Sequence, residues 1–262
     1  MKKFFVFLFP FFLFFFAFQK VDADYATDYQ AYINASGSYQ TAYNDYQTAR
    51  ANYLASGSLD SEYTAKQATL KLLQLRDSLV VNYLQAVSSK IEISQGFLDT
   101  DRASLQSQLA AEIAWHQAHS TKLASAGNLT DLVTDSNEAK TRWTSTRLII
   151  YQSLISLGSA QNSYIRGKLT GEITALESKI AQIRTNQDKD VTLIERSLFD
   201  VKNKIIRSQD KDNLAKSLIF ATKPEAGSAT FLTAQTYLVD SSLYLKDANQ
   251  GLLQIITQIK TN

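Results

Sequence analysis

The chain has 262 residues, with 27 Lys+Arg, 25 Asp+Glu, two histidines and no cysteine. The lack of cysteine excludes a disulfide framework and any site that depends on a thiolate. No block of five like charges occurs, so the sequence has no charged tail of the kind that binds nucleic acid. The length is sufficient for one or two domains with a hydrophobic core.

The N-terminal segment has the parts of a secretory signal peptide. Residues 4–18 form an apolar run behind Lys2 and Lys3, and Val21-Asp22-Ala23 places small residues at −3 and −1 before Asp24. As a helix this run would reach about 22 Å, short of the roughly 30 Å hydrocarbon core. We therefore predict that residues 1–23 are a cleaved signal peptide, with retention as an anchor as the alternative. The mature protein is then periplasmic, cell-surface or extracellular, with no membrane span.

Cleavage gives the first testable prediction. Mass spectrometry of the exported protein should find Asp24 at the N-terminus, because the −3/−1 pattern ends at Ala23. Recovery of the intact chain from washed membranes would contradict this prediction and establish the anchor instead.

Cleavage also removes the apparent basicity of the chain. Residues 1–23 contain three lysines and one acid, so the 239 remaining residues have 24 Lys+Arg and 24 Asp+Glu. A net charge of zero gives no bulk attraction to phosphate, and we expect no nucleic-acid partner.

The mature chain has the pattern of helices. Tyrosine recurs every seven residues from Tyr25 to Tyr53, and Tyr29, Ser36, Tyr43 and Arg50 occupy the position four residues after each tyrosine. Alternating intervals of four and three are typical of a helix packed lengthwise on a partner. We predict this tyrosine-rich helix over 24–55, ending where Ser56-Gly57-Ser58 offers a glycine and a new cap.

Four further helical segments follow. Polar and glycine-containing breaks delimit helices over 59–94 and 100–124, and Pro224 with Gly227 ends a long segment over 136–222. Residues 185–190 fit either a turn or a continuous helix, so the long segment is one helix or a pair. Two apolar stripes run along it, which predicts two packing neighbours and a central place. The last helix, 228–260, has the clearest heptad, from Phe231 through Leu245 to Ile259.

These elements predict an all-α fold for residues 24–262, an elongated and mostly antiparallel helical bundle with coiled-coil-like packing. Long tracts without proline or glycine clusters favour helices over a β-sandwich, which needs turn signals every 8 to 12 residues.

Motifs for catalysis or for a cofactor do not occur in this sequence. His116 and His119 lie three residues apart with Glu112 one turn before them, but two histidines do not complete a metal site. We interpret His116 as a residue at the core edge and His119 as a polar group near a helix C-terminus. The sequence has no nucleophile elbow or phosphate loop, and we expect neither enzymatic activity nor a metal or cofactor.

Residues 112–140 contain Glu112-Ile-Ala-Trp115, Ser125-Ala-Gly127, Leu129-Thr-Asp131-Leu132 and Glu138-Ala-Lys140. Together with the tyrosine-rich start, this segment resembles a group of uncharacterised exported helical proteins from bacteria. The resemblance implies a bacterial origin and the helical class, and it carries no activity or site residues.

The sequence thus predicts an exported structural or interaction protein of the cell envelope or surface. Tyrosine is enriched in recognition surfaces, so Tyr29 and Tyr43 are the candidate contacts to an envelope protein or a glycan, with self-association as a further option. The alternative is a ligand-binding helical bundle, with a pocket near Trp115, His116 and Trp143.

Overall fold

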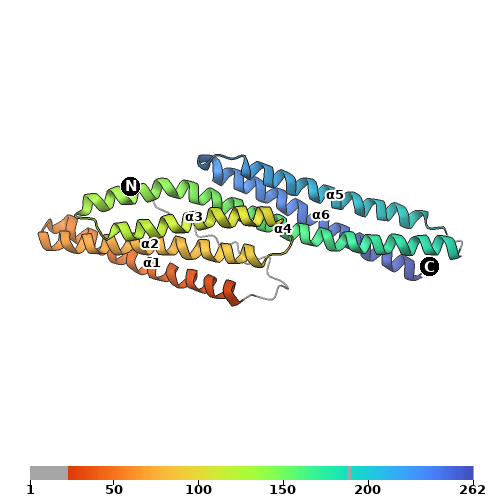
Figure 1. The fold of residues 1–262 in the computed structure, drawn as a ribbon, viewed down its shortest axis with the longest axis horizontal. Coiled ribbons are helices and arrows are strands. Elements are labelled where there is room, and N and C mark those ends of the chain that lie inside the picture. The colour runs from red at the N-terminus through yellow and green to blue at the C-terminus, as the bar shows by residue number, and fades with distance from the viewer. Residues whose placement is uncertain (1–22, 188–189, 262) are drawn as a thin grey trace.

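A computed structural model describes residues 23–187 and 190–261 (Figure 1). This part of the chain contains six α-helices and no strand, which confirms the elongated, mostly antiparallel all-α bundle. The helices are α1 (Ala23–Ser56), α2 (Leu59–Ile93), α3 (Asp99–Leu123), α4 (Leu129–Gln187), α5 (Thr192–Phe220) and α6 (Gly227–Thr261), and a short 3-10 turn, η2 (Pro224–Ala226), precedes α6. The predicted signal peptide lies outside the described residues, except for Ala23. None of the described helices combines the length and apolarity needed to cross a membrane.

The long segment predicted over 136–222 is a pair of helices. The helix α4 ends at Gln187 and α5 begins at Thr192, so the chain reverses in the polar stretch that the sequence left open. The helix also starts earlier than 136. The Asn128 side chain accepts from the Asp131 N–H at 2.9 Å, and the Asp131 carboxylate accepts from the N–H groups of Gly127 and Asn128. This reciprocal cap satisfies orphan donors and begins the helix at Leu129.

Helix α4 is the central element of the rod. Its 59 residues extend about 90 Å at roughly 1.5 Å per residue. Its N-terminal part packs with α2 and α3, residues 148–157 pack with both groups of helices, and the part from Leu169 packs with α5 and α6. We call α1, α2, α3 and residues 129–157 of α4 the N-terminal sector, and residues 158–187 of α4 with α5 and α6 the C-terminal sector. Figure 1 shows α4 running through both sectors.

The turn between α2 and α3 packs closely on the middle of α4. Gly96 has a φ of +86°, which favours glycine. A Cβ at this position would lie 2.1 Å from the carbonyl oxygen of Ala160. Only glycine allows the backbone of this turn to approach α4 so closely, and the contact joins the N-terminal sector to the junction with the C-terminal sector.

The heptad of α6 forms the core of the C-terminal sector. Leu245 and Leu252 are buried against α4 and α5, which confirms the predicted core position of Leu245. The alternating positions Ala234, Ser241 and Ala248 are fully buried as well. Small side chains here let α5 and α6 approach closely along their length.

Helix α1 packs against α2 alone in the described part of the chain. The tyrosine heptad packs on α2, a partner helix that the sequence did not identify, and alanines share the second position of the seam. Ala42 and Ala49, three residues after Tyr39 and Tyr46, are the buried residues, whereas Tyr29 is exposed and Tyr43 is half-buried. Alanine at these positions allows α1 to pack closely on α2, and the tyrosine rings cover the edge of the contact between the two helices.

Candidate functional site

A cluster of charged side chains is buried in the N-terminal sector. Asp77 of α2 is 1% exposed and contacts both histidines of the chain. Its two carboxylate oxygens lie 2.9 Å from Nδ1 of His116 and 2.6 Å from Nδ1 of His119, both on α3. Because all three side chains are excluded from water, each depends on the others for its hydrogen bonds.

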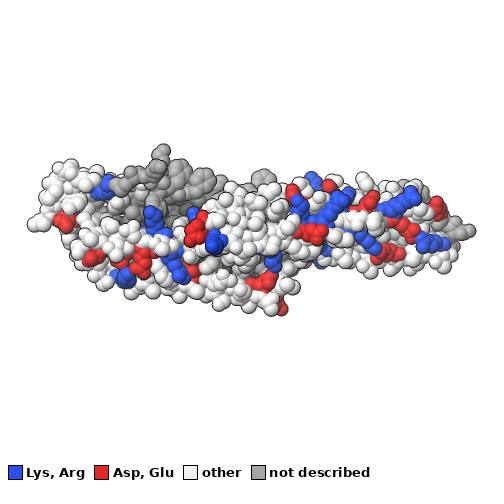
Figure 2. Space-filling model, turned by 90° about the horizontal axis from the view of Figure 1, so that it is seen from above, with Lys and Arg blue, Asp and Glu red and all other residues white. Residues whose placement is uncertain are grey.

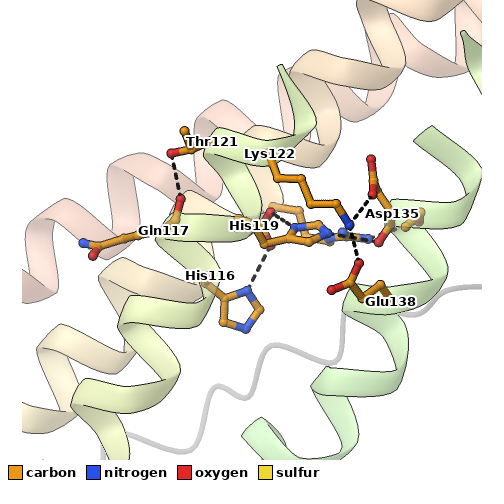
Figure 3. Close-up of polar contacts among 10 residues, drawn as sticks. His116, Gln117, His119, Thr121, Lys122, Asp135 and Glu138 are labelled. Atoms are coloured by element: carbon orange, nitrogen blue, oxygen red, sulfur yellow. Dashed lines mark hydrogen bonds and ion pairs between the residues drawn. The ribbon is translucent and has the colours of Figure 1, made fainter. Parts of the chain in front are cut away.

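Helix α4 completes this cluster from the other side, as Figure 3 shows. Nε2 of His119 lies 3.1 Å from the carbonyl oxygen of Asp135. The Lys122 ammonium lies 3.0 Å from the Asp135 carboxylate and 2.7 Å from that of Glu138. Hydrogen bonds to Glu138 and then Asp135 raise the pKa of Lys122, so this amine remains a cation. We call Asp77, His116, His119, Lys122, Asp135 and Glu138 the histidine cluster.

Three members of the histidine cluster carry atoms that could bind a metal. Ligand atoms of His119, Asp135 and Glu138 all lie within 4.8 Å of one another. The space between the two carboxylates is occupied by the Lys122 ammonium, which supplies the positive charge that they require. We therefore describe this group as an internal ion-pair cluster and assign no metal to it.

A second set of buried contacts adjoins the histidines. The Glu112 carboxylate of α3 accepts from Nε and Nη2 of Arg142 at 3.0 and 2.6 Å and from the Thr146 hydroxyl at 2.6 Å. The Trp115 ring stacks on His119 with centroids 4.9 Å apart, and the Arg142 guanidinium lies over the same ring at 5.5 Å. Trp115 thus lies in contact with both sets.

Sequence reasoning missed the partners of the histidines. His119 lies four residues before the end of α3, near the helix C-terminus as predicted, but its side chain is buried and contacts Asp77. One signal was present in the sequence: Asp77 interrupts the apolar stripe of α2 between Leu73 and Val80. An acid in such a stripe must be paired inside the protein. Its partners lie 39 and 42 residues away, so only the packing of α3 identifies them.

Two residues of the predicted ligand pocket, Trp115 and His116, lie in contact, with ring centroids 4.8 Å apart. His116 is buried against Asp77, Trp115 is half-buried, and Trp143 on α4 is 38% exposed. A hollow of about 440 Å³ lies elsewhere, on the first turns of α5, and is lined by Thr192, Glu195, Arg196, Phe199 and Asp200.

The two predicted partner contacts lie on α1. Tyr29 is 38% exposed and stands between Tyr25 and Tyr32, with ring centroids 6.0 Å from each. Tyr32 continues the ring contacts to Tyr83 of α2 at 5.1 Å. Burial, with a smaller contribution from Tyr29, raises the pKa of Tyr25 to about 12, so this phenol is neutral. The first turns of α1 are thus an aromatic edge with its outer rings in water.

The C-terminal sector has a buried polar network of its own. The Asp212 carboxylate of α5 accepts from Arg166 at 2.5 Å and from Asn162 at 3.0 Å, both on α4. Arg166 also donates to the Ser208 hydroxyl at 2.8 Å, and Ser208 contacts Ser241 of α6 at 2.8 Å. The Arg166–Asp212 ion pair therefore joins α4 to α5, and the hydrogen bond between Ser208 and Ser241 joins α5 to α6.

The molecular surface carries both charge signs. On the face shown in Figure 2, Lys and Arg are interspersed with Asp and Glu along the rod, and neither sign forms a continuous patch. Comparison with protein-family models, with curated proteins and with solved structures finds no match to this chain.

Proposed function

We propose that this chain is an exported interaction protein of the cell envelope or surface, a rigid helical rod that presents helix α1 to a partner. The observation that carries the proposal is the position of α1. It packs against α2 alone among the described elements, and most of its residues from Tyr29 to Ser56 are exposed or half-buried. Export rests on the signal-peptide pattern of residues 1–23.

The chemistry of the exposed residues of α1 favours a neutral, polar partner. The 34 residues of α1 include only four charged residues, Asp24, Asp28, Asp45 and Arg50. Exposed amides line the helix, where Gln30 donates to Asn34 at 3.1 Å and Gln40 donates to Asn44 at 3.4 Å. Tyrosine rings beside amides and hydroxyls are the groups that recognition surfaces use for polar, adaptable contacts. An envelope protein or a glycan fits this chemistry.

The architecture supports a presenting role. A single helix, α4, extends through both sectors, and the two buried ion-pair networks hold its neighbours in register. A rod of this kind keeps α1 at a defined place relative to the rest of the molecule. Bacterial origin, implied by the resemblance of residues 112–140, would place the partner in a bacterial envelope.

The test replaces the two candidate tyrosines. We expect the variant Tyr29→Ala/Tyr43→Ala to fold and to bind isolated envelope fractions about tenfold more weakly, corresponding to a loss of about 1.4 kcal/mol of binding free energy. The matched control is Tyr63→Ala on α2, which removes a tyrosine that is 64% exposed and should leave binding unchanged. Co-sedimentation with envelope fractions measures both.

Pretreatment of the envelope fraction identifies the partner class. Loss of binding after protease digestion indicates an envelope protein, and loss after glycan-degrading enzymes indicates a glycan. Equal binding by the parent and by the double variant would disprove recognition by α1, and the tyrosines would then serve packing alone.

A further inference from the structure

The hydrogen bonds of the histidine cluster define where its protons lie. Nε2 of His119 faces the carbonyl oxygen of Asp135, which can only accept, so this nitrogen carries a hydrogen. Nδ1 of His119 faces the Asp77 carboxylate at 2.6 Å, which also accepts. With Asp77 ionised, both nitrogens of His119 are donors. His119 is then a cation whose charge is balanced by Asp77 and whose two N–H groups both have partners.

His116 is bonded differently. Its Nδ1 donates to the other oxygen of Asp77 at 2.9 Å. Its Nε2 is buried and has no hydrogen-bond partner among the described residues. A neutral ring with hydrogen on Nδ1 leaves only a bare acceptor at Nε2. A second proton would instead put an N–H donor and a positive charge where nothing accepts them, which is the costlier arrangement.

We propose that the histidine cluster is an acid-sensitive latch that holds α3 against α2 and α4. The latch is closed when His119 is doubly protonated and His116 carries hydrogen on Nδ1 alone. It opens when Nε2 of His116 is also protonated. This device is independent of any partner of α1.

The other charged groups around the cluster do not supply the missing acceptor. They are Arg76 on α2, Glu112 and Lys122 on α3, and Asp135, Glu138 and Arg142 on α4. Both oxygens of Glu112 are engaged by Arg142 and Thr146, and the carboxylates of Asp135 and Glu138 contact Lys122. Arg76, adjacent to Asp77 in the chain, is a cation and would repel a second positive charge. A protonated His116 therefore gains no compensating ion pair beyond the Asp77 that it already shares.

The direction of the pH effect follows from counting protons. In the open state His116 binds a proton that the closed state does not accommodate, so acidification favours opening. His119 has the opposite sign, because the closed state holds its proton, and the latch weakens again when alkaline conditions remove it. The closed state is thus most stable between these limits.

The unchanged chain provides the first readout, because it has only two histidines. Nitrogen-15 NMR distinguishes a protonated ring nitrogen from a bare one. At neutral pH we expect two protonated nitrogens on His119 and a bare Nε2 on His116. A bare nitrogen on His119 at neutral pH, or a protonated Nε2 on His116, would overturn the proposal.

Trp115 provides the structural readout. Its ring lies 4.8 Å from His116 and 4.9 Å from His119, and the only other tryptophan, Trp143, can be replaced by phenylalanine. In Trp143→Phe we expect Trp115 emission to shift to longer wavelength as His116 becomes protonated. Protonation of His116 without any change in Trp115 emission would contradict the latch.

A variant links the transition to His116. His116→Asn in the Trp143→Phe background keeps an N–H donor near the place of Nδ1 but cannot titrate, so the acid transition of Trp115 should be lost. Its thermal melt at neutral pH shows whether it folds. A folded variant with the same acid transition as its parent would disprove the proposal, and the NMR measurement decides the matter if the variant does not fold.

Discussion

Replacement of Asp212 by alanine should destabilise the protein by about 3–5 kcal/mol, the usual cost of removing one partner of a buried ion pair. Asp212 is 1% exposed and accepts from both Arg166 and Asn162. Without it, the Arg166 guanidinium stays in the interior of the C-terminal sector, and Ser208 is its remaining hydrogen-bond partner among the described residues. The midpoint of urea unfolding, followed by circular dichroism, measures the change.

An exposed ion pair is the matched control for this prediction. Glu177 contacts Lys202 between the same two helices, α4 and α5, but the two side chains are 43% and 45% exposed. Glu177→Ala should change the free energy of unfolding by no more than about 1 kcal/mol. An equally small effect of Asp212→Ala would mean that water reaches Arg166 and that the network is not a structural element of the core.

The second large effect is expected at Leu245 in α6. Leu245 is 2% exposed and packs in the cluster that contains Leu198, Val201 and Leu252. Leu245→Ala should cost about 2–5 kcal/mol, because it removes buried methyl groups and leaves a cavity. Leu245→Asp should unfold the sector or detach α6, since a carboxylate there has no partner. Thermal melts of both variants test the prediction.

Leu253, also on α6 but 56% exposed, provides the control. Leu253→Ala should shift the free energy of unfolding by about 0.5 kcal/mol or less. Unchanged melting of both Leu245 variants would instead show that this heptad faces solvent in the isolated protein.

The helices themselves could be predicted from the sequence, because the information that specifies them is local. The seven-residue recurrence of tyrosine from Tyr25 and of large apolar residues from Phe231 predicts a helix with one buried side wherever that side packs. Breaks were predictable for the same reason, since Gly57 and Pro224 change the backbone at their own positions. The predicted start of the long segment, residue 136, differed from the observed start of α4 at Leu129. Several polar residues near this point could cap a helix equally well, and the structure shows that Asn128 and Asp131 form the cap.

The buried clusters, in contrast, were decided by tertiary structure. Nothing near Asp77 in the chain identifies His116 and His119 as its partners, and nothing near Asp212 identifies Arg166. Likewise, periodicity does not distinguish Ala42 from Tyr43 as the residue that meets α2, since both positions lie on the same side of α1. The sequence therefore predicted five helical segments and where most of them end, and left open whether 136–222 is one helix or two. The packing of helices far apart in the chain decides which helix faces meet and which charges are buried against each other. Several faces of a single helix can be equally suitable for burial, and only close packing against a neighbour selects one of them.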